Sequence, residues 1–321
     1  MGTPSATVRA LGQRGLEMSE EMARRGSDQS ASDRRIPVRR EWVGAPSGTL
    51  RNPTCWLMLF TLALFGGTTW AYLSGSFPAW VTVGLNSLAI YVAFTVMHES
   101  MHGVAHANRK INTWMGRPMG LLLTISQPMF RAVHYEHHSH TNDPERDPDL
   151  FISKAPVWAL PVWALGVVVQ YRRHYYGRKL WRDRKELREA VGFELFLALA
   201  VILALATGTF AKLAVVWFLP ALIAVLFLAM AFDYLPHYPY DSRERYHDTR
   251  VCPGGMGFVV LLGQNYHLIH HLWTTVPWFR YRAVFDEIRP ELEARGARIG
   301  WRVEPTETWR GNRAAAPRAN A

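Results

Sequence analysis

Residues 52–97 read NPTCWLMLFTLALFGGTTWAYLSGSFPAWVTVGLNSLAIYVAFTVM and contain no Asp, Glu, Lys, Arg or His. At ~1.5 Å per helical residue, this run is long enough to cross a ~30 Å hydrocarbon layer twice. Turn-forming residues in its middle, Ser74-Gly75-Ser76-Phe77-Pro78, predict the bend between the two crossings. The stretch therefore predicts a transmembrane hairpin.

A second block, residues 195–232, carries a single charge, Lys212, which lies beside Thr207-Gly208-Thr209. The alternative is a buried hairpin in a soluble protein, but soluble cores seldom contain uncharged runs of this length. We therefore predict an all-α integral membrane protein whose four transmembrane helices form two hairpins.

The formal net charge of +10 is unevenly distributed. Residues 1–51 carry nine arginines, and residues 172–188 carry eight Lys or Arg, whereas the predicted hairpin bends carry Lys212 alone. The positive-inside tendency then predicts cytosolic termini and a cytosolic central segment of a protein in the inner membrane. This distribution is explained by topology and anionic lipid, so nucleic-acid binding is not predicted. Residues 1–51 contain no apolar signal segment, and two cysteines provide neither a disulfide framework nor a thiolate metal site.

Eight of the 13 histidines fall into three clusters with helical spacing. The first cluster is a pair at i and i+4, and the other two repeat the spacing i, i+3, i+4, which projects side chains from one helix face. The clusters are His98 and His102; His134, His137 and His138; and His267, His270 and His271. Because an even number of predicted crossings precedes each cluster, all three are expected at one membrane face.

Eight neutral imidazoles exceed what one tetrahedral ion binds, so the clusters predict two metal ions. His237, which follows the second hairpin, is a ninth candidate. Imidazole suits iron, zinc or copper, and a redox role would require iron or copper. Ligand histidines usually donate their second N–H to a carboxylate or carbonyl. The acidic candidates for this role are Glu99, Asp143, Asp147, Asp149 and Asp233.

The whole chain is predicted to divide into three segments. Residues 1–50 form a disordered basic segment, residues 51–305 a single membrane domain, and residues 306–321 a flexible tail. Residues 118–130 and 155–171 are apolar but too short to cross, which favours interfacial helices. Residues 273–305 are predicted to contain an amphipathic cytosolic helix, so that a histidine-rich helical cap covers one membrane face.

The histidine clusters resemble the three histidine boxes of the membrane fatty-acid desaturase and hydroxylase superfamily. The boxes are His98-Glu99-Ser100-Met101-His102, His134-Tyr135-Glu136-His137-His138 and His267-Leu268-Ile269-His270-His271. This resemblance covers roughly residues 56–301. It implies a non-haem di-iron centre that activates O2, with the histidines acting as ligands and no further catalytic side chain.

A finer resemblance points to the bacterial carotenoid β-ring hydroxylase branch. It is carried by residues 105–112 and 142–149, by Phe232-Asp233-Tyr234-Leu235-Pro236-His237, and by residues 263–273 followed by Pro277-Trp278. The resemblance implies that His237 is an additional ligand. Glu99 stands where that branch has aspartate, and Thr274 where it has proline. These departures affect the prediction of the substrate more than the prediction of the metal.

The resulting hypothesis is an O2-dependent oxygenase that hydroxylates the β-ring of a carotenoid, converting β-carotene to zeaxanthin. An acyl-lipid desaturase and a carotenoid ring ketolase remain alternatives, and a non-catalytic metal- or haem-binding membrane protein is a more distant one. No dinucleotide or haem motif is present in the sequence, so electrons are expected from a ferredoxin-type donor with its reductase. The basic residues 172–188 would suit an acidic donor.

Overall fold

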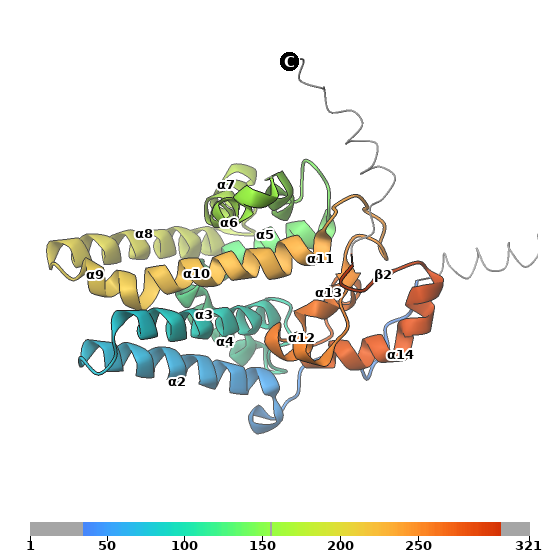
Figure 1. The fold of residues 1–321 in the computed structure, drawn as a ribbon, viewed down its shortest axis with the longest axis horizontal. Helices are drawn as coiled ribbons and strands as arrows, with labels where there is room; N and C mark the ends of the chain where they lie inside the picture. The colour runs from blue at the N-terminus through green and yellow to red at the C-terminus, as the bar shows by residue number, and fades with distance from the viewer. Residues whose placement is uncertain (1–34, 155, 303–321) are drawn as a thin grey trace, which may run out of the picture.

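The computed structural model describes residues 35–154 and 156–302, and within them the chain is almost entirely helical (Figure 1). The first hairpin consists of α2 (Pro53–Leu73) and α3 (Ala79–Met101), preceded by the short helix η1 (Thr49–Arg51). Asn52 caps α2 by accepting the backbone N–H of Thr54 at 3.0 Å. The chain turns at residues 74–78, as predicted.

The second hairpin consists of α8 (Arg184–Ala206) and a continuous helical span from Phe210 to His237. That span contains α9 (Phe210–Leu213), the π-helical turn η4 (Ala214–Phe218), α10 (Leu219–Leu228), a second π-helical turn η5 (Ala229–Tyr234) and α11 (Leu235–His237). Helix α8 begins 11 residues before the apolar block at residue 195, because Asp183 caps it and its first turns are polar. Within the described residues, four helices are thus long and apolar enough to span a membrane, which confirms the predicted fold class.

Helix α3 is the central helix of the bundle. It packs against α2, α10 and α4 (Arg109–Leu122) and is the most deeply buried of the four spans. Midway along it, the Asn86 amide donates to the carbonyl of Val216 at 2.8 Å. Val216 lies in the π-helical turn η4, so a polar contact inside the bundle links the two hairpins. Gly116 of α4 permits close approach, since a Cβ there would lie 2.4 Å from Ser100 Oγ.

Short helices connect the two hairpins at the end of the bundle where α3 ends (Figure 1). After α4 come α5 (Gln127–Ser139), the 3₁₀ turns η2 (Asp149–Lys154) and η3 (Val157–Ala159), α6 (Leu160–Leu165) and α7 (Val167–Arg178). Pro118 lies inside α4, and the chain bends instead at residues 123–126.

A small C-terminal unit caps this end of the bundle (Figure 1). It contains β1 (Arg250–Val251), α12 (Gly255–Val260), η6 (Gln264–Tyr266), α13 (His267–Leu272), η7 (Trp278–Arg280), α14 (Tyr281–Ala294) and β2 (Arg298–Ile299), with β1 and β2 pairing in parallel. Helix α14 is the predicted amphipathic helix, and Phe285 and Ile288 on its buried face form a second core with α13.

The prediction that residues 1–50 are disordered is wrong for residues 35–50. Ile36 and Trp42 are buried in the core of the C-terminal unit, and the Trp42 indole donates to Glu287 of α14 at 2.7 Å. Two apolar side chains that find a partner surface are enough to order a polar segment. The rest of the predicted N-terminal segment, residues 1–34, and the predicted tail, residues 306–321, lie outside the described residues.

Candidate metal centre

All nine predicted histidines converge at one end of the four-helix bundle. They come from the end of α3, from α5, from the end of the fourth span and from α13, which lie side by side there (Figure 1). Within the described residues, the groups of metal-binding geometry include none of the other four histidines, which are His106, His140, His174 and His247.

Local packing orients each histidine-bearing helix. On α13, Leu268, Ile269 and Leu272 are buried in the core shared with α14, which leaves the histidine face turned toward α5. Gly263, with φ +79°, precedes this helix, and a Cβ there would lie 2.8 Å from the carbonyl oxygen of Trp278. Only glycine accommodates both the left-handed backbone and this close approach.

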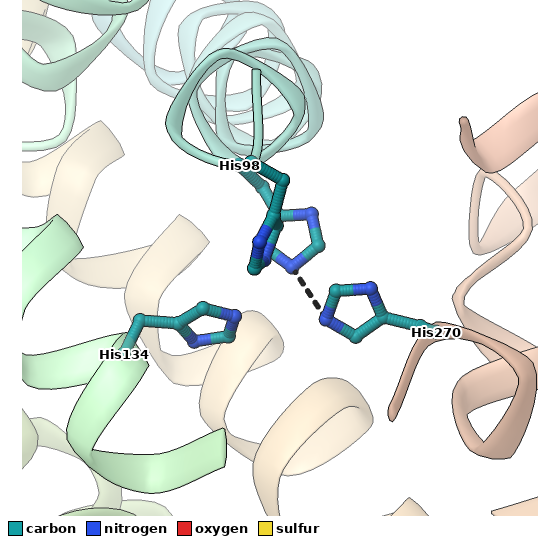
Figure 2. Close-up of side chains that lie close together, drawn as sticks. His98, His134 and His270 are labelled. Carbon is teal, nitrogen blue, oxygen red and sulfur yellow. Dashed lines mark hydrogen bonds between the residues drawn. The ribbon is translucent and has the colours of Figure 1, made fainter. Parts of the chain in front are cut away.

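Five imidazoles form one cluster, which we call the five-histidine cluster. Its members are His98, His102, His134, His138 and His270. The Nε2 atom of His270 lies 3.1 Å from that of His98 and 2.9 Å from that of His138, and the Nε2 atoms of His138 and His134 are 2.8 Å apart. Figure 2 shows His98, His134 and His270 pointing toward one another from three separate elements.

The remaining four imidazoles form the four-histidine cluster, made of His137, His237, His267 and His271. The Nε2 atom of His271 is 3.1 Å from that of His267 and 3.3 Å from that of His137, and the Nε2 atoms of His267 and His237 are 3.1 Å apart. Each three-histidine box is thus divided between the clusters: its i and i+4 members share one cluster, and its i+3 member lies in the other.

The ring nitrogens in both clusters have the spacing of ligands around a common ion. An ion bound at ~2.1 Å by imidazole nitrogens holds neighbouring nitrogens about 3 Å apart. Burial holds the pKa of His102, His134 and His270 well below the usual histidine value, so these rings are neutral, which is the form that binds metal. Both ring nitrogens of buried His102 also lack any hydrogen-bond partner. The residues therefore fit two metal ions.

Two carboxylates stand directly behind the four-histidine cluster. The Nδ1 atom of His137 lies 2.8 Å from Asp147 Oδ1 and 3.4 Å from Asp149 Oδ2. Burial alone would lower the pKa of His137, but these carboxylates raise it to about 10. An anion that accepts Nδ1–H orients Nε2 toward the cluster and makes it a stronger ligand. Asp147 and Asp149 therefore lie where they can accept the Nδ1–H of His137 and orient this ring.

Two hydroxyl groups that sequence reasoning missed contact other ligand candidates. The Tyr281 hydroxyl is 3.0 Å from His270 Nδ1, and the Thr141 hydroxyl is 3.4 Å from His271 Nδ1. Tyr281 begins α14 and Thr141 follows α5, so each lies outside the helix that carries its partner. Thr141 follows His137 by four residues, but its contact is with His271, 130 residues away, and Tyr281 has no helical spacing to a box. The sequence therefore contains no signal that pairs either hydroxyl with its histidine.

The other acidic candidates occupy different positions. Glu99 accepts the backbone N–H of Trp278 at 3.1 Å, and its other oxygen is 3.9 Å from His98 Nδ1, beyond hydrogen-bond distance. Asp143 is not at the site, which corrects its interpretation as a candidate: it caps the turn at Glu145 and pairs with Arg243 at 2.7 Å. Its short side chain satisfies the local backbone and is directed away from the histidines. Asp233 lines a cavity instead.

Two adjoining cavities lead to the clusters from the membrane domain. The inner one, of about 330 Å³, is lined by histidines of both clusters, among them His98 and His267. The outer one, of about 550 Å³, is lined mainly by apolar side chains of α3, α7 and α10. Four residues line both: Phe94, Phe130, Tyr171 and Asp233. An apolar molecule in the outer cavity would therefore present one end to the histidines.

The model of the fatty acid desaturase family matches residues 75–303, which include all three histidine boxes. The chain belongs to the fatty acid desaturase family. This membership agrees with the resemblance seen in the boxes and with the four predicted spans.

Several characterised members of the family are similar to this chain. The β-carotene ketolase of Paracoccus sp. (strain PC1) is 29% identical over 237 residues, which cover 70% of this chain and 86% of the relative. The zeaxanthin 4-ketolase of Chlamydomonas reinhardtii is 24% identical over 70% of this chain and 49% of the relative. The dihydrorhizobitoxine desaturase of Bradyrhizobium elkanii is 26% identical over 57% of this chain and 61% of the relative. This chain thus spans about half the length of the algal relatives that it matches.

Proposed function

We propose that this protein is an O2-dependent membrane oxygenase that hydroxylates the β-ring of a carotenoid at a non-haem di-iron centre. One observation carries the proposal: nine imidazoles form two clusters, and members of both clusters line a cavity that adjoins an apolar one. Imidazole-rich sites with carboxylates behind them suit iron, whereas a structural zinc site would need only four ligands.

The nine histidines would hold the two irons, five at one and four at the other. When bound, these irons supply O2 activation and oxidation of an unactivated C–H bond. The side chains themselves bind and orient: Asp147 and Asp149 hold the Nδ1 proton of His137, and Tyr281 contacts Nδ1 of His270. No separate general acid or base is required for this chemistry.

The cavity supports a hydrocarbon substrate. Phe94, Phe130 and Leu228 contribute its apolar lining, as expected of a site for an apolar ligand. Four of its lining residues carry polar groups: Thr124, Tyr171, Arg172 and Asp233. An apolar ring at the end of a long polyene would enter with little desolvation cost, because it has no polar group to leave unpaired.

Ketolation of the same ring is the second candidate, and the names of the relatives favour it, since several are carotenoid ketolases. The two reactions differ in how often one carbon is oxidised. A single hydroxylation gives an alcohol, whereas two at one CH2 give a geminal diol that loses water to form a ketone. Hydroxylation rests on the resemblance of residues 232–237 and 263–273 to the hydroxylase branch.

Expression in cells that accumulate β-carotene tests the proposal. Chromatography is expected to show hydroxylated products ending in zeaxanthin, and a His271→Ala variant is expected to give none. Accumulation of keto-carotenoids instead would select the second candidate. A change confined to the unsaturation of acyl chains would contradict both and favour an acyl-lipid desaturase.

We also propose that the histidine clusters and both termini lie on the cytosolic side of the inner membrane, with electrons supplied by a ferredoxin-type donor. The charge distribution supports this orientation, since the described arginines that precede the first span, residues 35–51, and the basic residues 172–188 lie at the end of the bundle that carries the histidine boxes. A reporter that is active only in the cytosol, fused after residue 321, is expected to be active. Activity only of a periplasmic reporter would contradict the orientation.

A further inference from the structure

A polar groove reaches the five-histidine cluster from outside the membrane domain. It has an empty volume of about 1590 Å³, and His102, Gly103 and Tyr135 lie at its inner end. It shares no lining residue with the two cavities that lead to the clusters from the membrane domain. The metal centre therefore has two separate approaches, one apolar and one polar.

The groove carries an excess of positive charge. Five cationic side chains line it, from α4, α5 and the start of α8: Arg109, Arg117, Arg131, Arg182 and Lys185. Three acidic residues also line it, and internal contacts engage all of them. Glu186 pairs with Arg131 and Arg182, and Glu189 with Arg117. Asp183 caps α8.

Two of the cations remain available to a partner. Arg109 and Lys185 are exposed, and neither forms an ion pair within residues 35–154 and 156–302. The cationic groups outnumber the acidic ones, and the unpaired ones lie on two different helices across the groove. Such a surface attracts an acidic protein and orients it before contact.

An exposed aromatic ring connects this surface to the cluster. Tyr135 is 38% exposed, and its ring lies edge-on to that of His102 with the centroids 5.5 Å apart. Its hydroxyl donates to the carbonyl of Met101 at 3.0 Å, which fixes the ring beside the end of α3. His102 in turn contacts the rings of four other members of the five-histidine cluster. Only the ring of Tyr135 would thus separate a partner in the groove from His102, a member of the cluster.

We infer that this groove is the docking site of an acidic one-electron carrier protein, which delivers electrons to the five-histidine cluster at the Tyr135–His102 edge. The inference rests on the proposed function, which creates the demand for electrons. Each hydroxylation consumes O2, two electrons and two protons, and yields the alcohol and one water. Two carrier molecules are therefore oxidised by one electron each per turnover, and the protons come from solvent.

The test compares two electron sources on the full-length protein in lipid nanodiscs. One source is an acidic [2Fe–2S] ferredoxin kept reduced by its NADPH-dependent reductase, and the other is dithionite with methyl viologen, which needs no docking surface. The test variant combines Arg109→Glu and Lys185→Glu, because neither side chain holds an ion pair that supports the fold. The matched control combines Arg40→Glu and Lys154→Glu, which reverse two exposed charges outside the groove.

The test variant is expected to lose about tenfold or more in ferredoxin-driven kcat/KM and to keep its viologen-driven rate. The control variant is expected to match the wild type with both sources. Equal loss with both sources in the test variant would mean that the groove serves the fold or a lipid headgroup, and it would overturn the inference. Unchanged ferredoxin-driven turnover would overturn it as well. Wild-type protein that is inactive with both sources would instead contradict the proposed function.

Discussion

The two histidine clusters are built differently. Among the described residues, the five-histidine cluster has no carboxylate within hydrogen-bond distance, because Glu99 lies 3.9 Å from His98 Nδ1. Phe94 and Phe130 stack on His98 and His134 with centroids 5.6 and 5.5 Å apart, and a tyrosine hydroxyl contacts His270. The four-histidine cluster has one imidazole fewer, and two carboxylates lie within 3.4 Å of His137. The five-histidine cluster thus has an additional imidazole, whereas the four-histidine cluster has two carboxylates behind one of its imidazoles.

This difference indicates how each cluster would retain a cation. A carboxylate behind an imidazole makes the ring more basic and supplies charge that neutral ligands lack. A cluster without such carboxylates compensates with a further nitrogen ligand. The four-histidine cluster is therefore expected to be the more sensitive to the loss of any one member.

Single ligand substitutions should separate the clusters most clearly. His270 and His271 are neighbours in sequence but belong to different clusters. We expect both His270→Ala and His271→Ala to lower product formation more than about 100-fold. Each variant removes a proposed ligand, and this should cost more than the roughly 10- to 100-fold typical of losing an outer hydrogen bond to a ligand. His271→Ala leaves three imidazoles and should lose one iron, whereas His270→Ala leaves four and should retain more.

Metal analysis of the purified variants measures this difference. Circular dichroism of each variant serves as the control for folding. Equal iron contents in the two variants would show that the clusters do not differ in the way described here.

The outer groups should differ in the same direction but by less. Asp147→Asn removes the charge behind His137 and is expected to weaken iron binding about 10- to 100-fold in competition with a chelator. Tyr281→Phe removes a neutral contact at 3.0 Å and should weaken binding only a few-fold. If Tyr281→Phe proved the more damaging variant, the account of charge compensation would be wrong.

Filling the outer cavity should affect both clusters alike, because the cavities serve them jointly. Ala229 lines the outer cavity and is almost fully buried, so Ala229→Phe would occupy space proposed for the substrate. We expect about a tenfold loss of kcat/KM with iron content unchanged. Leu222→Phe, at an exposed position on the same helix, is the matched control. Loss of iron in Ala229→Phe would assign the residue to the metal site instead.

Asp143→Asn should have the smallest effect. The residue contacts a turn and Arg243, whose side chain is 60% exposed, so solvent screens the ion pair and its loss should change stability little. Iron content and turnover are expected to stay within twofold of the wild type. A large loss of iron would return Asp143 to the set of supporting acids.

Much of the fold was predictable because hydropathy reports directly on lipid contact. The uncharged run at residues 52–97 and the run at 195–232, which contains only Lys212, located both hairpins, and an even number of crossings predicted that the boxes would meet at one end. The limits of α8 were predicted less well, since hydropathy marks the apolar part of a helix and not its polar first turns. Ile36 and Trp42 were missed because their partners lie more than 200 residues away.

Helical spacing identified the histidines of the site but not their division between two clusters. The i, i+3, i+4 pattern places three rings on one face, and whether His137 joins His134 or His271 depends on where α13 packs. The supporting residues show the same limit. Asp147 and Asp149 were found because they closely follow a box, whereas Tyr281 is brought to His270 only by the turn between α13 and α14.

The iron content of the full-length protein, measured by elemental analysis together with ⁵⁷Fe Mössbauer spectroscopy, tests the central claim most directly. The account predicts two non-haem irons per chain, with one lost in His271→Ala. A single iron, a full complement of zinc, or two irons retained by the variant would contradict the claim that the two histidine clusters hold a di-iron centre.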